Sequence, residues 1–298
     1  MPRAKTNGIE IEYETFGASD AQPLLLIMGL GGQMVLWDEA FCAMLAERGF
    51  RVIRFDNRDI GKSTHLDAAG LPDLTAAITA ALNGAPYSAA YTLSDMAADT
   101  VGLLDALDIA RADVVGASMG GMIAQTLAIE HPERVRTLTS IMSTTGDPSL
   151  PPARPEALAA LLSPAPSDRA GAIEHGVTVF RTIGSPGALF EEQQIRKLAT
   201  LQHDRGFHPA GLMRQLAAIL ASGSRKAKLA KLRIPTLVIH GREDPLIPFE
   251  AGVDTAASIP GARLEAVDGM GHDMPTVLWP RFVDWISDHA ARSAHAAA

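Results

Sequence analysis

A serine between two glycines is the feature of this sequence with the clearest chemical meaning. Ser118 lies in the segment 116–120 (GASMG), which follows the apolar segment 112–115 and precedes a run of helix-forming residues. A G-x-S-x-G motif between a strand and a helix holds the serine in a tight, strained turn that exposes it as a nucleophile. Gly116 and Gly120 lack a Cβ, so the chain can turn sharply and the helix can pack close to the strand. The same pattern also occurs by chance in joining turns, but its position after a strand favours a nucleophile.

A serine hydroxyl is a weak nucleophile at neutral pH, so it needs a base and a group that orients the base. His272 lies in the glycine-rich segment 268–272 (DGMGH), ahead of a predicted terminal helix. Asp244 follows an apolar segment, 235–239, which places it at the carboxyl end of a strand, where functional sites collect. We therefore predict that Ser118, Asp244 and His272 are the catalytic residues.

Other residues compete for these roles. The carboxylates that compete with Asp244 are Glu243, Asp268 and Asp273, and the position directly after the strand favours Asp244. His240 ends a strand and is expected to be a buried structural residue. His131 precedes a proline and is expected to cap a helix end or face solvent. A structural charge and turn network is expected from Asp56, Arg58, Asp59 and Ser63.

The elements that must position these residues alternate between strands and helices. Strands are predicted at 23–28, 51–55, 112–115, 135–142, 236–239 and 264–267, and helices at 40–48, 93–107 and 281–289. The turn at Asn7-Gly8 predicts an antiparallel hairpin at one edge, and Thr92 and Asp95 resemble a capping box. The tail 290–298 is expected to fray. The alternation predicts an α/β fold with a mostly parallel central sheet flanked by helices.

The alternation stops in the middle of the chain. Residues 147–232 begin with four prolines and continue with alanine- and leucine-rich segments at 156–162, 191–201 and 210–221. We predict a helical cap inserted at 147–232, between two parts of one core, residues 1–146 and 233–298. A second irregular stretch, residues 66–91, contains a helix-like segment at 74–82, and long excursions of this kind often border a binding site.

Composition narrows the classes of function. The 298 residues carry a formal charge of −8 and are 47% hydrophobic, which gives no basic surface for nucleic acid or an anionic membrane. Cys42 is the only cysteine and is expected to be buried, so there is no disulfide and no CxxC metal or redox pair. No secretory signal or membrane-spanning run is evident, so a cytoplasmic location is expected. The sequence leaves a monomer and a homodimer both open.

The order Ser118, Asp244, His272 is the order of the α/β-hydrolases, and the chain resembles this family over nearly its whole length. The segment 55–63 (FDNRDIGKS) and the G-x-S-M-G-G turn are similar to those of small esterases, specifically the methylesterases that act on aromatic polyketides of the aclacinomycin type. The resemblance implies that Ser118 is the nucleophile, that His272 is the general base and then the acid, and that Asp244 orients the imidazolium.

The resemblance also implies an oxyanion hole made of backbone amides. One is that of Met119, and the other maps to Leu30 in the segment 28–32 (MGLGG). The family often has His-Gly where this chain has Met28-Gly29, which leaves backbone donation intact but removes a histidine that could brace the loop. No metal and no cofactor are implied. A serine at this turn argues against the dehalogenase and epoxide-hydrolase branches, which need a carboxylate nucleophile.

Several methionines lie close in sequence to the proposed catalytic residues. Flexible thioether side chains around one cavity form an adaptable apolar pocket. The residues predicted to line it are Met28, Gly29, Met34, Met122 and Met270. We expect a serine hydrolase that cleaves a carboxylic ester of a small apolar or aromatic substrate through an acyl-enzyme. The alternatives are lactone or carbon–carbon bond hydrolysis, cofactor-free perhydrolysis, or a non-catalytic receptor for a small ligand.

Overall fold

The fold is built on one eight-stranded sheet. In the computed structural model, which describes residues 1–296 and the side chains of residues 1–292, the strands are β1 (Arg3–Thr6), β2 (Ile9–Phe16), β3 (Gln22–Ile27), β4 (Phe50–Phe55), β5 (Ala112–Ala117), β6 (Val135–Ile141), β7 (Thr236–Gly241) and β8 (Arg263–Val267). Their order is β1-β2-β4-β3-β5-β6-β7-β8. The hairpin β1–β2 is antiparallel and β2 joins β4 antiparallel, whereas all other neighbours are parallel. The predicted α/β class is confirmed.

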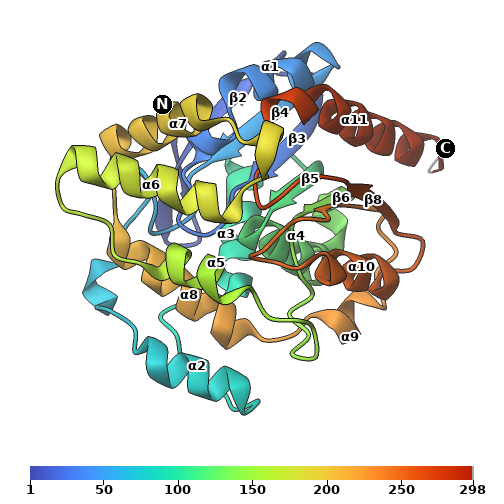
Figure 1. Cartoon of the computed structure of the whole chain (residues 1–298). Coiled ribbons are helices and arrows are strands. Elements are labelled where there is room, and N and C mark those ends of the chain that lie inside the picture. Colours follow the sequence, from blue (N-terminus) through green and yellow to red (C-terminus); the bar gives the residue numbers. More distant parts are fainter. Residues whose placement is uncertain (297–298) are drawn as a thin grey trace.

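Helices cover both faces of the sheet, as buried parallel strands require. The helices α1 (Glu39–Glu47) and α11 (Trp279–Ala296) pack on one face, and α3 (Leu93–Ala106), α4 (Met119–Glu130) and α10 (Phe249–Ser258) pack on the other (Figure 1). Strand β3 displays the two-sided burial: Leu24 and Leu26 belong to one core cluster, Leu25 and Ile27 to the other, and none of the four is exposed.

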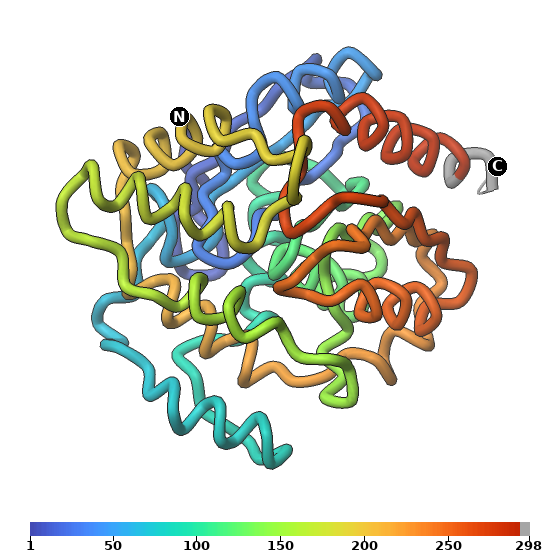
Figure 2. The backbone as a smooth tube through the Cα atoms, in the orientation of Figure 1, coloured from blue at the N-terminus to red at the C-terminus, as the bar shows by residue number. Residues whose placement is uncertain are grey.

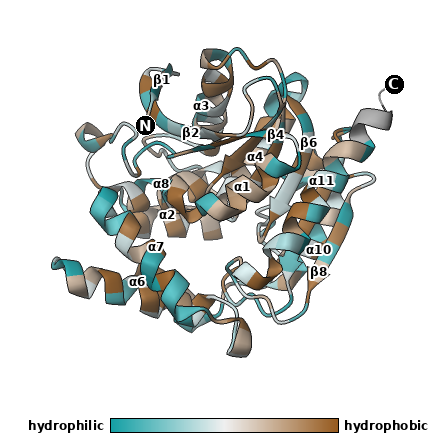
Figure 3. Cartoon of the chain, turned by 90° about the horizontal axis from the view of Figure 1, so that it is seen from above, coloured by the Kyte–Doolittle hydropathy of each residue, from teal (hydrophilic) through white to brown (hydrophobic). Residues whose placement is uncertain are grey.

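Five α-helices lie between β6 and β7. They are α5 (Pro155–Leu162), α6 (Arg169–Ile183), α7 (Glu192–Arg205), α8 (Pro209–Ser222) and α9 (Lys226–Leu229), and we use the name cap for this segment. Helices α6 and α7 lie side by side (Figure 1) and mix hydrophilic with hydrophobic residues, unlike the hydrophobic central strands (Figure 3). Helices α6, α9 and α10 were not predicted from the sequence. The division into core and cap domains stays a prediction.

The excursion at residues 66–91 contains α2 (Leu74–Leu82), as the sequence predicts. This helix packs against α8 and lies at the edge of the molecule (Figures 1 and 2). The short 3-10 helices are η1 (Met34–Leu36), η2 (Asp67–Ala69), η3 (Pro132–Arg134), η4 (Gly187–Leu189) and η5 (Thr276–Leu278). The expectation that this excursion borders a binding site stays a prediction.

Several local predictions can be compared with the structure. Both hydrogen bonds of the capping box between Thr92 and Asp95 are present at the start of α3, and Cys42 is fully buried. The tail predicted to fray, 290–298, is helical as far as Ala296, where α11 ends; residues 297 and 298 lie outside the described residues, and fraying stays a prediction. Within residues 1–296, no helix combines the length and the apolar character needed to cross a bilayer.

The path of the chain places the predicted site at the carboxyl ends of two central strands. From β3 the chain proceeds to β4 on one side, and from β4 it returns past β3 to β5 on the other. The strand order therefore reverses between β3 and β5, and in open α/β sheets ligands bind outside the carboxyl ends of the strands at such a point. Residues 28–32 follow β3 and Ser118 follows β5, so both lie at this reversal.

The buried His289 on α11 makes stability depend on pH. Burial lowers the pKa of His289 from 6.5 to about 4, although its Nε2–H donates to the carbonyl oxygen of Pro235 at 3.2 Å. Above pH 6.5 both the folded and unfolded states are neutral at this residue. Between pH 6.5 and 4 the unfolded state gains a proton and the folded state does not, so stability falls with pH.

We expect His289 to contribute a loss of up to about 3 kcal/mol in the free energy of unfolding between pH 7 and pH 4. Urea unfolding across this range measures the loss. The variant His289→Gln retains a side-chain donor for the Pro235 carbonyl but does not titrate, so its pH dependence should be flatter. If the free energy of unfolding depended equally on pH in both proteins, His289 would not be the cause of the loss of stability.

Candidate active site

Ser118 occupies a strained turn between β5 and α4. Its backbone has φ +55° and ψ −122°, in a region that residues with a Cβ rarely adopt. Its N–H donates to the carbonyl oxygen of Ile141 on the neighbouring strand at 2.9 Å. A Cβ on Gly116 would lie 2.1 Å from the carbonyl oxygen of Gly120, and one on Gly120 would lie 2.0 Å from that of Ile27. The two glycines therefore allow α4 to approach β5 and β3, as expected.

The structure brings the three predicted catalytic side chains into one chain of contacts. The Oγ of Ser118 lies 2.9 Å from Nε2 of His272, and Nδ1 of His272 lies 2.7 Å from Oδ2 of Asp244. The imidazole is 7% exposed and the carboxylate side chain is fully buried. Because a carboxylate only accepts hydrogen bonds, Nδ1 donates to Asp244, which leaves Nε2 with a lone pair for the serine hydroxyl.

Asp244 is held by the turn that follows β7. Its Oδ1 accepts hydrogen bonds from the backbone N–H groups of Leu246 and Ile247, both at 2.9 Å. The second oxygen, Oδ2, is thereby left facing His272. An oxygen that is fixed in this way selects one tautomer and one orientation of the imidazole.

His240 and Asp273 lie nearby but do not take these positions. Nε2 of His240 donates to the carbonyl oxygen of Ile247 at 2.8 Å, and burial lowers the pKa of this imidazole, so it is neutral and structural. Asp273 instead accepts hydrogen bonds from the backbone N–H and the hydroxyl of Ser185, at 2.9 and 2.5 Å, and burial raises its pKa. It ties the loop of His272 to the end of α6.

The segments that carry the predicted oxyanion donors both adjoin Ser118. A Cβ on Gly29 would lie 3.0 Å from the Cβ of Ser118, so the segment after β3 passes directly beside the nucleophile. Met119 is the first residue of α4, where N–H groups have no partner within the helix. In the described part of the chain, the N–H groups of Leu30 and Met119 have no hydrogen-bond acceptor. Their roles stay predictions.

The five residues predicted to line the pocket differ in their exposure and in the core cluster to which they belong. Met28 and Met270 belong to the core cluster on the α1 and α11 face, and Met122 belongs to the cluster on the α4 face. Met34 and Met270 are fully buried, whereas Met28 and Met122 retain 8% and 6% exposure. Gly29 adjoins Ser118, as described above. Substrate contact by this set stays a prediction.

The charged run after β4 is a buried network, as expected. Asp56 accepts from the N–H of Met34 at 2.7 Å and Arg58 pairs with Asp99 at 2.6 Å. The hydroxyl of Ser63 donates to the carbonyl oxygen of Asp56. Asn57, which was not singled out from the sequence, donates to the carbonyl oxygen of Met28 at 2.9 Å and so holds the end of β3.

Sequence reasoning also missed Ser143. Its hydroxyl donates to the carbonyl oxygen of Ser118 at 2.8 Å, and this oxygen also accepts from the N–H groups of Gly121 and Met122. The peptide whose N–H belongs to Met119 is therefore hydrogen-bonded at its carbonyl end. No motif marks Ser143, because only the pairing of β6 with β5 places it beside the turn.

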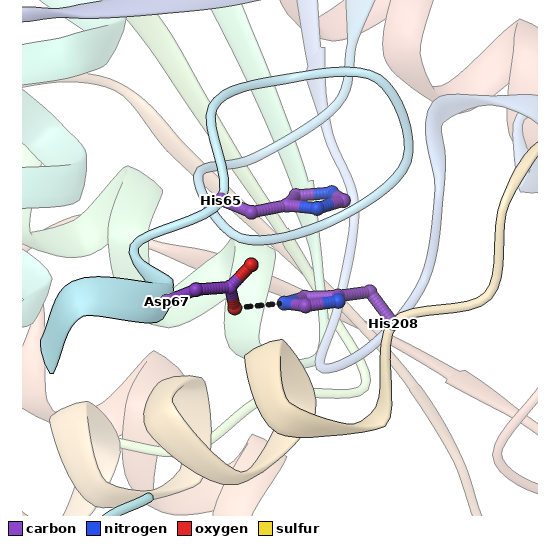
Figure 4. A group of neighbouring side chains, drawn as sticks. All are labelled: His65, Asp67 and His208. Atoms are coloured by element: carbon purple, nitrogen blue, oxygen red, sulfur yellow. Dashed lines mark ion pairs between the residues drawn. The ribbon is translucent and has the colours of Figure 1, made fainter. Parts of the chain in front are cut away.

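One cluster outside this site has residue types that bind metals. His65, Asp67 and His208 present atoms within 4.8 Å of one another, and the two imidazoles are stacked with centroids 3.9 Å apart (Figure 4). Nη2 of Arg214 donates to Oδ1 of Asp67 and lies near Nε2 of His208, both at 3.0 Å, and Nε2 of His208 pairs with the same Oδ1 of Asp67 at 3.0 Å (Figure 4). The guanidinium contacts the atoms that would have to bind a metal ion, and its positive charge repels a cation. We therefore interpret the cluster as a packing contact between segment 61–67 and α8.

Comparison with known proteins agrees with this architecture. Residues 22–172 match the model of the alpha/beta hydrolase fold family. The chain is similar to rhodomycin D methylesterase DauP of Streptomyces sp. (strain C5), with 31% identity over 93% of this chain and 94% of the relative. It is also similar to 2-hydroxymuconate semialdehyde hydrolase of Pseudomonas sp. (strain CF600), with 33% identity over 71% of this chain and 73% of the relative.

Among solved structures, the enol-lactonase from Burkholderia xenovorans LB400 superposes with a TM-score of 0.74 at 22% identity, over 97% of this chain and all of that chain. The chain belongs to the alpha/beta hydrolase fold family. The resemblance to the methylesterase branch is also confirmed, since two rhodomycin D methylesterases are among the similar proteins. The chain is therefore a hydrolase-family protein with methylesterase relatives.

Proposed function

We propose that this protein is a serine esterase that hydrolyses a carboxylic ester through an acyl-enzyme on Ser118. The observation that carries the proposal is the contact chain from Ser118 through His272 to Asp244, at 2.9 and 2.7 Å. A half-buried serine, a buried histidine and a buried aspartate in this geometry supply a nucleophile, its base and the group that orients the base. The methylesterase relatives support ester hydrolysis.

The proposed reaction has two halves. Oγ of Ser118 attacks the ester carbonyl while Nε2 of His272 takes the hydroxyl proton, and the N–H groups of Leu30 and Met119 stabilise the oxyanion. The tetrahedral intermediate collapses, the carbon–oxygen bond to the alcohol breaks, and His272 returns the proton to the leaving oxygen. His272 then deprotonates a water molecule that attacks the acyl-enzyme, which releases the acid and restores Ser118. Asp244 stabilises the imidazolium in both halves.

The substrate class is proposed from the relatives and the apolar surroundings. Methyl esters of small apolar or aromatic acids are the first candidates, because the relatives are named methylesterases. The second candidate reaction of the same three residues is hydrolysis of a lactone or of a carbon–carbon bond. This candidate is supported by the similarity to a relative named 2-hydroxymuconate semialdehyde hydrolase.

A panel of substrates tests the proposal. The purified protein is assayed on p-nitrophenyl acetate and butyrate, on aromatic methyl esters and on simple lactones, with and without EDTA. We expect ester turnover that EDTA does not change, since no step uses a metal. Turnover of lactones alone would support the second chemistry. Folded protein that hydrolyses none of these compounds, but is stabilised thermally by one of them, would indicate a ligand receptor instead.

A further inference from the structure

A fully buried glutamine connects the cap to the loop that carries one predicted oxyanion donor. Gln215 lies on α8 and is 0% exposed. Its Oε1 accepts the backbone N–H of Gly31 at 2.9 Å, and its Nε2 donates to the carbonyl oxygen of Arg58 at 2.9 Å. Both ends of the amide are therefore satisfied by main-chain groups of the core, one after β3 and one after β4.

The bond to Gly31 fixes the peptide plane directly after Leu30. Each peptide unit is planar, so the orientation of the Leu30 N–H relative to this plane depends only on the two backbone dihedrals of Leu30. The turn is closed on its other side by the N–H of Gly32, which donates to the carbonyl oxygen of Gly29 at 3.2 Å. The N–H groups of Gly31 and Gly32 are therefore both hydrogen-bonded, whereas the Leu30 N–H has no acceptor in the described part of the chain.

Gly31 also lies against a second side chain of α8. Gly31 has φ +67°, and a Cβ there would lie 2.7 Å from a methyl carbon of Leu212. The side chains of Leu212 and Gln215, three residues apart on α8, therefore contact the same residue of the loop from one helix face. The cap, and not the core alone, fixes the conformation of this loop.

We propose that Gln215 is a positioning residue for ester hydrolysis: it holds the 29–32 loop from the cap so that the Leu30 N–H points at the developing oxyanion. This inference rests on the proposed function. Orientation of a preformed donor matters because an oxyanion-hole hydrogen bond acts only when the donor already lies at the position of the charge. Activity would then require that α8 be docked on the core.

Docking of α8 itself depends on other residues. Arg214 forms two hydrogen bonds with Asp59, at 2.7 and 2.8 Å, and both side chains are buried. A Cβ on Gly211 would lie 2.0 Å from the carbonyl oxygen of Asp59, so the helix packs directly on this backbone. The loss of the Gln215 amide should therefore misplace the loop without releasing the helix.

Gln215→Met tests the proposal, because methionine has similar length but cannot hold the Gly31 N–H. We expect kcat for p-nitrophenyl butyrate to fall about tenfold or more, with KM changed by less than about threefold, since the lost interaction acts on the transition state. The matched control is Gln202→Met. Gln202 on α7 accepts the N–H of Gln33 at 3.1 Å, two residues further along the same segment, and its loss should change kcat by less than about threefold.

Gln215→Glu supplies a second readout. As a neutral acid it can accept from Gly31 and donate to Arg58. As a carboxylate it can still accept from Gly31, but it repels the carbonyl oxygen of Arg58, which displaces the side chain from the loop. The ratio of its kcat to that of the wild-type protein should therefore rise as pH is lowered, a trend that Gln215→Met should not share.

Unchanged kcat in Gln215→Met, or equal kcat losses in Gln215→Met and Gln202→Met, would overturn the inference. If Gln215→Met does not fold, a pH-independent ratio for Gln215→Glu would overturn it. Failure of the wild-type protein to hydrolyse any ester would instead refute the proposed function, so the two failures are distinguishable.

Discussion

Ser118→Ala should lower kcat for ester hydrolysis by roughly 10⁴-fold or more. Its Oγ is the group in contact with Nε2 of His272, at 2.9 Å, so its removal eliminates both the attacking atom and the proton that the imidazole would accept. Loss of a triad nucleophile typically leaves only the small rate enhancement from binding and the oxyanion hole. The assay is steady-state hydrolysis of p-nitrophenyl butyrate by protein shown to be folded by circular dichroism.

A matched control for this substitution is Ser140→Ala. Ser140 is a buried serine on the neighbouring strand β6, and its Oγ accepts a hydrogen bond from Gln125 at 3.3 Å. Its loss should change kcat by less than about threefold, because surrounding core positions act on stability more than on the reaction. If Ser118→Ala retained more than about one hundredth of the wild-type kcat, Ser118 would not be the nucleophile.

Asp244→Asn should lower kcat by roughly 10³- to 10⁴-fold with little change in KM. The backbone N–H groups of Leu246 and Ile247 both donate to Oδ1, so the oxygen of the new amide must occupy that position. Its NH₂ group then faces Nδ1 of His272 and forces this nitrogen to accept. The proton moves to Nε2, and the imidazole can no longer take the proton of Ser118.

Asp273→Asn is the control that separates orientation of His272 from general loop stability. Asp273 is a half-buried carboxylate next to His272 in the sequence, but its Oδ1 accepts hydrogen bonds from Ser185. An asparagine oxygen can still accept these bonds, so kcat should fall by less than about tenfold. Equal losses in the two variants would mean that Asp244 has no special part in setting the tautomer.

The parallel core strands and the candidate triad were predictable because their signals are local. The strand before Ser118 is a short buried apolar run, and Gly116 and Gly120 are needed for packing within a few residues of the serine. Asp244 and His272 each follow a strand, so their positions at the carboxyl ends follow from the parallel sheet itself. Turn chemistry likewise predicted the hairpin at Asn7-Gly8, which joins β1 to β2.

The residues that support the site were not predictable, because their partners are distant in sequence. Gln215 lies in an alanine- and leucine-rich helix, where a polar residue is ordinarily assigned to the solvent face, but its partner Gly31 is 184 residues away. Helix α6 was missed for a related reason. It contains Gly171 and Gly176, which weaken helix propensity, and its packing against α5 and α7 compensates for this.

Labelling of the nucleophile tests the central claim most directly. The purified protein is incubated with diethyl p-nitrophenyl phosphate, and three quantities are followed: p-nitrophenolate released, esterase activity remaining and the site of the adduct by peptide mass spectrometry. The account predicts one p-nitrophenolate per chain, loss of activity in the same proportion and a diethylphosphoryl group on Ser118. Ester hydrolysis that persists after complete modification of Ser118, or inactivation with the adduct on another residue, would contradict it.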